Sequence, residues 1–540
     1  MLSYRKLAMR VLGRPLHTEG IDSPRPASQR AAAFILTAAM LTTLAAPAFA
    51  DIWHIENGDI TISAGESGNN VTQNNNTTYG DTNTIITNQN KDTASSHTVT
   101  IEAKDKDDKV EVTLKDVNID TSSRNKAAVS VTGEGDTNIK LDGDNALKSD
   151  IYRSGIYGSG SLTISGGEND SLTAQGGSGA NGISSSGSLT ISGGTVTANG
   201  DDGGRGISSS GSVTISGGST VTANGGSGTI SGGDGIWSGG GVTISGGSTV
   251  TANGGNGGSL VGGDGIRSGG GLTVSDGTVT AKGGNGDSKD GYGGDGIRSG
   301  GVVTISGNTV NAAGGYGGKV GGYGICSFDR VAISGGTVEA AGGNGSTGGG
   351  SGIYSSVIDL SGSLELTAKA GSPTGKALLQ NGRELDLDTI KDKLGPGAKV
   401  TTTDANGKTK EVSSPLPVEP EGPVIPEESS SSSDDGSATP SAPVSPLPGL
   451  TVTDKDGQRI SYTSTQSGNT LTVCVGRFTA SFRISLAALR QLRAEGIETI
   501  TFQTVLCSTT LSVDELLAMG GEDAGAGLTH RFTDSSLTVG

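Results

Sequence analysis

Apolar and polar residues alternate in a unit that recurs along residues 155–368. In one copy, Leu189 and Ile191 alternate with hydroxyl residues, which is the two-residue period of a half-buried strand. Residues 195–198 repeat the alternation, and a short Gly-Ile segment precedes both runs. Glycine pairs separate the runs, as expected for turns that need unusual backbone angles. Each unit therefore predicts three short strands and three turns.

The units repeat every 24 to 31 residues, which is typical of a solenoid. A single unit cannot bury its apolar face, so neighbouring units must stack. The sequence therefore predicts a mainly β fold, a parallel β-helix with three short strands per coil. At about 4.8 Å per coil, the stacked isoleucines would extend over roughly 34 Å. The inward isoleucines of the Gly-Ile segments are Ile156, Ile183, Ile207, Ile236, Ile266, Ile297, Ile325 and Ile353.

A high glycine content is also typical of disordered linkers and of collagen. A Gly/Ser-rich segment is often a disordered linker, but linkers do not keep recurring inward aliphatic positions. Collagen is excluded because the glycines have no strict three-residue period.

Residues 1–50 carry the pattern of a secretion signal. Basic residues precede an apolar stretch at 31–46, and Ala48-Phe49-Ala50 matches an A-x-A cleavage site, so we expect the mature chain to begin at Asp51. The alternative is a retained membrane anchor, although the stretch is short for a span. No later segment approaches the roughly 20 apolar residues that a span needs.

The remaining boundaries follow changes in composition. Residues 51–150 read as a β-rich lead-in or cap, 151–369 as the repeats, and 370–412 as a C-terminal cap with a short helix at 385–393. Residues 413–449 are rich in Pro, Ser and Glu and predict a disordered tether. Residues 450–540 alternate strand and helix patterns and predict a small α/β module. Its first helix is expected from Ser485, as N-cap, to Gly496.

Charge narrows the range of partners. The chain has a net charge of −17, and residues 1–50 carry six basic and two acidic side chains, so their removal leaves −21. Such an acidic protein is not expected to bind nucleic acid or anionic membranes. Only 32% of residues are hydrophobic and 3% aromatic, which suits the thin core of a solenoid better than a large globule.

The turns and core strands carry a resemblance to a known family. The runs Asp-Ile-Thr-Ile-Ser at 59–63, Thr-Leu-Lys-Asp-Val-Asn-Ile at 113–119 and Leu-Asp-Gly-Asp-Asn-Ala-Leu at 141–147 precede the repeats. Together with Gly-Ile-Tyr and Leu-Thr-Ile-Ser-Gly-Gly, they resemble bacterial exported proteins whose repeat region is labelled a carbohydrate-binding domain. The resemblance covers roughly residues 51–370. It implies a secreted or cell-surface location and contact with glycans, and it supplies no catalytic residue.

Few groups suit catalysis or metal binding. The four histidines are scattered, and no spacing indicates a metal site or a nucleophile paired with a base. Asp234, Asp264 and Asp295 share one column of the repeat and are candidate calcium ligands, although an Asp-Gly turn explains each of them better. We expect no cofactor.

The chain has three cysteines, too few for a disulfide framework. Cys474 and Cys507 lie in one segment and are a candidate disulfide, with two free thiols as the alternative. Cys326 would be left unpaired.

One outward column of residues is a candidate binding surface. If each isoleucine points inward, the residue after it points outward, which would place Trp237, Arg267 and Arg298 on successive coils. Stacked Trp and Arg side chains are a favourable pair that suits an acidic or ring-shaped sugar. The alternative is an ordinary solvated strand face, and Tyr292, Tyr316 and Tyr323 on the glycine loops offer another surface. The candidate ligand-binding residues are Tyr157, Trp237, Arg267, Arg298 and Tyr354.

These observations favour a non-catalytic binding or adhesion protein with glycans as ligands. A β-helix polysaccharide lyase or hydrolase is the first alternative, but the few acidic residues in the repeats argue against the convergent carboxylates it needs. A structural spacer that presents residues 450–540 is the second.

Overall fold

A computed structural model describes residues 51–414 and, further on, residues 450–453, 459–460, 462–467, 469–475, 480–504, 508–519, 525–530 and 535–539. The predicted secretion signal and nearly all of the predicted tether lie outside these residues. The chain forms two compact units that divide between Val418 and Glu419. None of the helices in the described part is long and apolar enough to cross a membrane.

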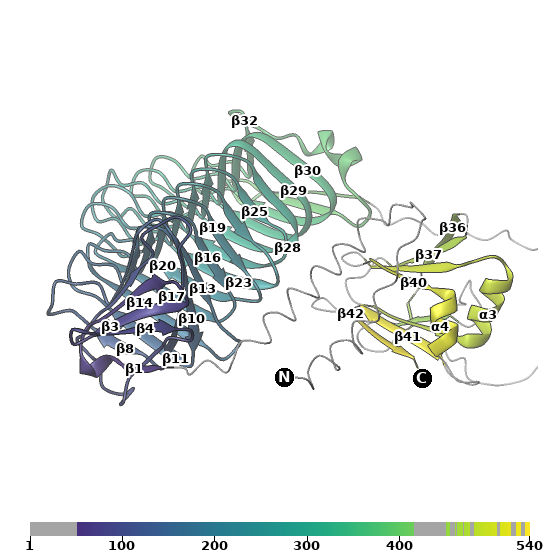
Figure 1. The fold of residues 1–540 in the computed structure, drawn as a ribbon. Helices are drawn as coiled ribbons and strands as arrows, with labels where there is room; N and C mark the ends of the chain where they lie inside the picture. Colours follow the sequence, from purple (N-terminus) through teal and green to yellow (C-terminus); the bar gives the residue numbers. More distant parts are fainter. Residues whose placement is uncertain are drawn as a thin grey trace, which may run out of the picture. The chain divides into compact units, whose positions relative to one another are not determined.

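The first unit is a β-solenoid, which confirms the predicted fold (Figure 1). One coil consists of β15 (Ile183–Ser185), β16 (Leu189–Ser192) and β17 (Thr195–Asp201). These pair in parallel with β18 (Ile207–Ser209), β19 (Val213–Ser216) and β20 (Thr220–Asn224) of the next coil. Stacking in this manner produces three parallel ladders of strands.

The three ladders extend over most of the unit. The first ladder also contains β6 (Val99–Glu102), β9 (Val129–Thr132), β12 (Ile156–Gly158), β21 (Ile236–Ser238), β24 (Ile266–Ser268), β27 (Ile297–Ser299) and β31 (Leu378–Gln380). The second contains β7 (Lys109–Lys115), β10 (Asp136–Asp142), β13 (Ser161–Ser165), β22 (Val242–Ile244) and β25 (Leu272–Val274). The third contains β8 (Asn118–Asp120), β11 (Asp144–Lys148), β14 (Ser171–Ser178), β23 (Ser248–Asn253), β26 (Gly277–Lys282) and β33 (Lys399–Thr403). Strands of different ladders join in β28 (Val303–Ala313), β29 (Ile325–Ala341) and β30 (Ile353–Lys369).

The isoleucines of the Gly-Ile segments stack as the sequence predicts. Ile156 pairs with Ile183, and the register continues without a shift through every isoleucine of the set to Ile353. All eight are completely buried. The column of inward side chains begins before the regular repeats. Val99 pairs with Val129, and Val129 pairs with Ile156. Since burying one such side chain contributes about 1.5–3 kcal/mol, this column is a main source of stability.

Antiparallel strands close both ends of the solenoid. At the start, β2 (Ile60–Gly65), β3 (Gly68–Gln73) and β4 (Asn76–Asp81) form a meander whose β2 pairs with β6, while β1 (Ile52–His54) pairs with β5 (Ile85–Thr87) and η1 (Ile55–Asn57) lies between β1 and β2. At the other end, β32 (Arg383–Glu384) and β34 (Thr409–Ser413) pair with β31 and β33. The single helix predicted at 385–393 is instead two 3-10 turns, η2 (Leu387–Thr389) and η3 (Lys391–Lys393). These caps satisfy strand edges that would otherwise be open to pairing.

Glycine serves two different purposes in the solenoid. Gly217 and Gly218, between the second and third strands of a coil, have φ of +68° and +70°, which only glycine adopts readily. The loops between coils use glycine for close packing instead. A Cβ atom on Gly263 would lie 1.9 Å from the carbonyl oxygen of Gly233.

The close-packed glycines form a continuous chain of hydrogen bonds. Gly233 donates to Gly226 at 2.9 Å, Gly255 to Gly233 at 2.8 Å, and Gly263 to Gly255 at 2.8 Å. The same zigzag continues coil by coil to Gly371. The glycine-rich loops are therefore a packed layer of backbone beside the aliphatic core.

The second unit contains two sheets and two helices in its described residues. One sheet consists of β35 (Leu450–Thr453), β38 (Ala480–Ser485), β41 (Gly525–His530) and β42 (Ser535–Val539); the other consists of β36 (Thr463–Ser467), β37 (Thr470–Cys474), β39 (Thr499–Gln503) and β40 (Ser508–Ser512). The helices are α3 (Leu486–Ala494) and α4 (Val513–Met519). Ser485 caps α3 as predicted, because its side chain accepts from the amide of Ala488 at 3.2 Å. Phe482 and Phe502 pack with ring centroids 4.9 Å apart in the core.

Candidate functional site

The predicted outward column exists as a line of paired residues. Tyr157 pairs with Ser184, and the register continues through Ser208, Trp237, Arg267, Arg298 and Cys326 to Tyr354. The side chains of this line differ in solvent exposure: Tyr157 is 43% exposed, whereas Cys326 is only 1% exposed. Ser208 is also buried. The column is therefore divided into separate patches.

Trp237 and the arginines of this column already have partners within the protein. The guanidinium of Arg205, from the preceding coil, lies 4.4 Å from the ring centroid of Trp237. Arg267 lies 3.9 Å from a carboxylate oxygen of Asp264, and Arg298 lies 3.3 Å from one of Asp295. The ring of Trp237 and the guanidinium groups of Arg267 and Arg298 are thus already in contact with other side chains of the protein.

Cys326 and Tyr354 follow Arg298 at the C-terminal end of the column. Tyr354 stacks on Tyr323 with ring centroids 5.1 Å apart. Cys326 is buried, and desolvation, helped by the charge of Asp295, raises the pKa of its thiol to about 12. Such a thiol is unreactive at neutral pH. In the second unit, Cys474 Sγ lies 3.5 Å from the side-chain oxygen of Gln503, and Cys507 lies outside the described residues, so the predicted disulfide stays a prediction.

The three aspartates hold successive coils together. One carboxylate oxygen of each accepts the backbone N–H of the corresponding residue in the next coil. Asp264 donates to Asp234 at 2.9 Å, Asp295 to Asp264 at 2.7 Å, and Tyr323 to Asp295 at 2.7 Å. The other oxygen of each carboxylate faces an arginine. Within the described residues, no group of three or more His, Cys, Asp or Glu side chains is placed to hold a metal ion.

Burial raises the pKa of two carboxyl groups in this column, those of Asp264 and Asp295. Desolvation, with further contributions from Asp295 and Asp234, raises the pKa of Asp264 well above its usual value. Desolvation also raises the pKa of Asp295 to about 6, against the opposing effects of the Tyr323 amide and Arg298. A carboxyl with a raised pKa in the folded state stabilises the fold at low pH, and that contribution is lost as pH rises through the folded pKa.

We therefore expect Asp264→Asn to flatten the pH dependence of stability. Asn181 occupies the same column and accepts the amide of Arg205 at 2.8 Å, so an amide can replace the carboxylate here. Between about pH 4 and pH 7, the wild type should lose more free energy of unfolding than the variant. Urea unfolding across this range measures the difference. Equal pH slopes for the two proteins would contradict it.

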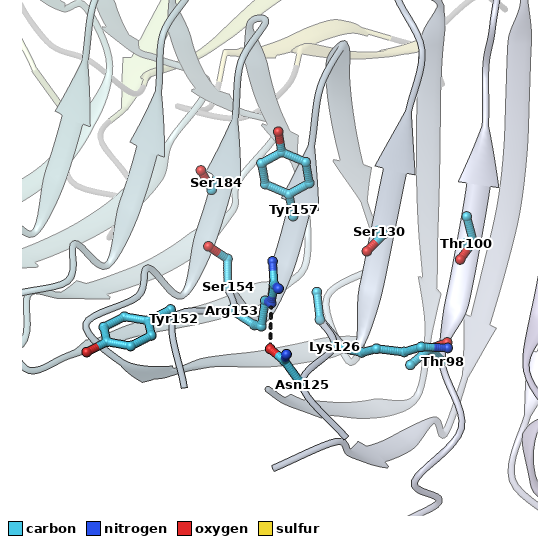
Figure 2. Close-up of a pocket in the computed structure, with 11 residues that line it drawn as sticks. Thr98, Thr100, Asn125, Lys126, Ser130, Tyr152, Arg153, Ser154, Tyr157 and Ser184 are labelled. Carbon is cyan, nitrogen blue, oxygen red and sulfur yellow. Dashed lines mark hydrogen bonds between the residues drawn. The ribbon is translucent and has the colours of Figure 1, made fainter. Parts of the chain in front are cut away.

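A groove lies at the N-terminal end of the outward column. Its volume is about 620 Å³, within the range of ligand pockets. Thr100, Ser130, Tyr157 and Ser184 occupy the same position on four successive coils and form its floor (Figure 2). The floor therefore presents one aromatic ring among hydroxyl groups.

Two loops form the side of the groove. Residues 125–127 precede β9, and residues 152–154 precede β12, so the loops belong to consecutive coils. Tyr152 has φ of +58°, a left-handed conformation that is uncommon and costly for a bulky residue. Its amide donates to the carbonyl of Ser178 at 2.9 Å, and its side chain is 78% exposed. The fold thus holds a strained, exposed tyrosine beside the floor, as binding sites often do.

The basic side chains of the groove are positioned by specific contacts. Lys126 binds Asp59 at 2.9 Å, and Arg124 binds the other oxygen of Asp59 at 2.8 Å. Burial alone would raise the pKa of Asp59, but hydrogen bonds from Lys126, the Thr98 amide and Arg124 outweigh it and lower the pKa to about 2. The ion pair with Asp59 therefore fixes Lys126 at the rim of the groove.

Arg153 differs from Lys126 in its partner. Its Nε donates to the neutral side-chain oxygen of Asn125 at 3.3 Å (Figure 2). Among the described residues, no carboxylate lies within ion-pair distance of its guanidinium, which is exposed. The Arg153 side chain is thus held by Asn125, and its remaining N–H groups have no side-chain partner among the described residues.

Of the candidates from the sequence, only Tyr157 lies in the groove. Sequence reasoning missed Tyr152, Arg153, Lys126 and Asn125. A signal was present, because Lys126 and Arg153 each stand three residues before an inward ladder residue, Val129 or Ile156. The loops leading into consecutive coils therefore carry basic residues at equivalent positions.

Comparisons with protein-family models, curated proteins and solved structures found no match to this chain. The fold defines it as a β-solenoid protein, and any functional argument depends on the geometry of the groove.

Proposed function

We propose that this protein is exported and binds glycans without cleaving them, through the groove beside Tyr157. The observation that carries the proposal is the combination of exposed aromatic rings, Tyr157 and Tyr152, with fixed hydrogen-bonding groups on neighbouring coils. Sugar rings have apolar faces that pack on aromatic rings and hydroxyl edges that bond to amides, hydroxyls and guanidinium groups. Most ligand sites have such a small set of convergent polar groups.

The lining of the groove supports binding over catalysis. Its residues include no Asp, Glu, His or Cys. Glycosidic bond cleavage requires a general acid and a base or nucleophile within reach of the bond, normally a pair of carboxyl groups. The carboxylates of Asp234, Asp264 and Asp295 already accept backbone amides and face arginines. Release of reducing or unsaturated ends from polysaccharides by the purified protein would instead favour a lyase or hydrolase.

Glycan binding by the full chain is expected to depend on Tyr157. On a glycan array followed by titration calorimetry, Tyr157→Ala should weaken binding about tenfold or more, because it removes the aromatic part of the floor. Tyr354→Ala is the matched control, since Tyr354 lies in the same column but stacks on Tyr323 and is not part of the groove.

Two results would contradict the proposal. One is the absence of any glycan binding by the wild type, which would favour the spacer alternative. The other is equal affinity of Tyr157→Ala and the wild type for the same glycan, which would place binding elsewhere.

A further inference from the structure

The charges around the groove differ from those of the chain as a whole. The chain has 38 basic and 55 acidic residues, yet the groove lining includes Lys126 and Arg153 and no acidic residue. Lys126 is paired with Asp59 outside the lining, so the positive charge that the groove offers a ligand is mainly that of Arg153, whose side chain donates to the neutral Asn125. Within an acidic protein, such a patch favours an anionic ligand.

From this arrangement we propose that the groove selects glycans that carry an anionic group, a carboxylate or a sulfate ester, and that Arg153 binds that group. The inference rests on the proposed glycan-binding function and specifies the ligand class. The planar guanidinium forms paired hydrogen bonds with oxyanions, and its only described side-chain partner is the neutral Asn125. Lys126 adds charge at the rim but shares it with Asp59.

The positions of these groups fit one sugar residue with a charged substituent. Figure 2 shows Arg153 rising from its loop beside Tyr157, with Asn125 below and Ser130 and Ser184 on the neighbouring strands. A ring packed on Tyr157 would direct its hydroxyls to the floor and its anionic group to Arg153. Arg267, in contrast, already faces a buried carboxylate and has less capacity for an anion.

Matched pairs of oligosaccharides test the inference with the full chain. The pairs are oligogalacturonate and its methyl ester, sialyllactose and lactose, and a sulfated galactan oligosaccharide with its desulfated form. At least one anionic member should bind about tenfold tighter than its neutral partner. Its affinity should fall as salt rises from low to high concentration, because exposed charge pairs are screened. The carboxylate and sulfate pairs distinguish the two sources of charge.

Variants assign the effect to Arg153. Arg153→Gln should reduce the ratio of the two affinities, anionic over neutral, to about one and remove the salt dependence of that ratio. Only the ratio is compared, so a loss of affinity shared by both members does not count for or against the inference. Arg267→Gln, which removes an arginine of the outward column away from the groove, should change neither.

The outcomes separate this inference from the proposed function. Equal binding of neutral and anionic members by the wild type would overturn the inference and leave glycan binding intact. A preference that survives Arg153→Gln would also overturn it. Binding to array glycans but to none of the anionic members would overturn the inference alone. Failure to bind both the members of the pairs and every glycan on the array would overturn the inference and the proposed function together.

Discussion

Replacing Ile266 with alanine is expected to lower the free energy of unfolding by about 2–5 kcal/mol, the usual cost of a large-to-small change in a packed core. Ile266 is completely buried and pairs with Ile236 and Ile297 of the neighbouring coils. A closed column of backbone and side chains cannot collapse far into the vacated space, so the loss should not be small. Urea unfolding of the full chain, monitored by the loss of β-structure in circular dichroism, measures this change in the free energy of unfolding.

Thr249→Ala is the control for this prediction. Thr249 lies on β23 with its side chain exposed, so only strand propensity changes, by less than about 1 kcal/mol. Equal unfolding free energies for the two variants would mean that Ile266 is not in a packed core.

Replacing Gly263 with alanine is the second change with a large expected effect. The new methyl group would meet the carbonyl oxygen of Gly233 at 1.9 Å and its carbon at 2.4 Å. Because both atoms are backbone, relief requires the coils to separate or the hydrogen-bonded glycine chain to break. We expect a loss of at least about 1–3 kcal/mol, as for other overpacked sites, in thermal or urea unfolding.

Gly348→Ala provides a matched control in the same layer of loops. A Cβ atom there would lie 3.5 Å from Thr374 Oγ1 and from a methyl group of Val320, which is ordinary contact. Removing a flexible glycine from the unfolded chain then makes this variant neutral or slightly more stable. If Gly263→Ala were as stable as Gly348→Ala, the glycine loops would not be packed as described.

The aliphatic ladder could be predicted because each inward residue repeats with the coil. Ile183 and Ile207 occupy the same place in two copies of the unit, and stacking follows from the need to bury both. The glycine layer could not be predicted in the same manner. Glycine occurs both in turns with positive φ and where two backbone segments pack closely. The sequence alone does not tell which of these reasons applies to Gly233 and Gly263.

The candidate site was predicted only in part for a related reason. Pairing of Trp237 with Arg267 along the column follows from the repeat, but the actual stacking partner is Arg205, whose reach depends on the preceding loop. The groove depends on loops of irregular sequence, and the left-handed backbone at Tyr152 has no sequence signal. Tyr157 was identified because it belongs to a strand with a fixed register.

Hydrogen–deuterium exchange of the full chain, with and without a saturating concentration of the glycan that binds best, tests the location of the site most directly. The account predicts slower exchange in the groove loops at 125–127 and 152–154, and no change around Trp237, Arg267 and Arg298. Protection confined to the coils of Trp237 to Arg298, with the two groove loops unchanged, would contradict it.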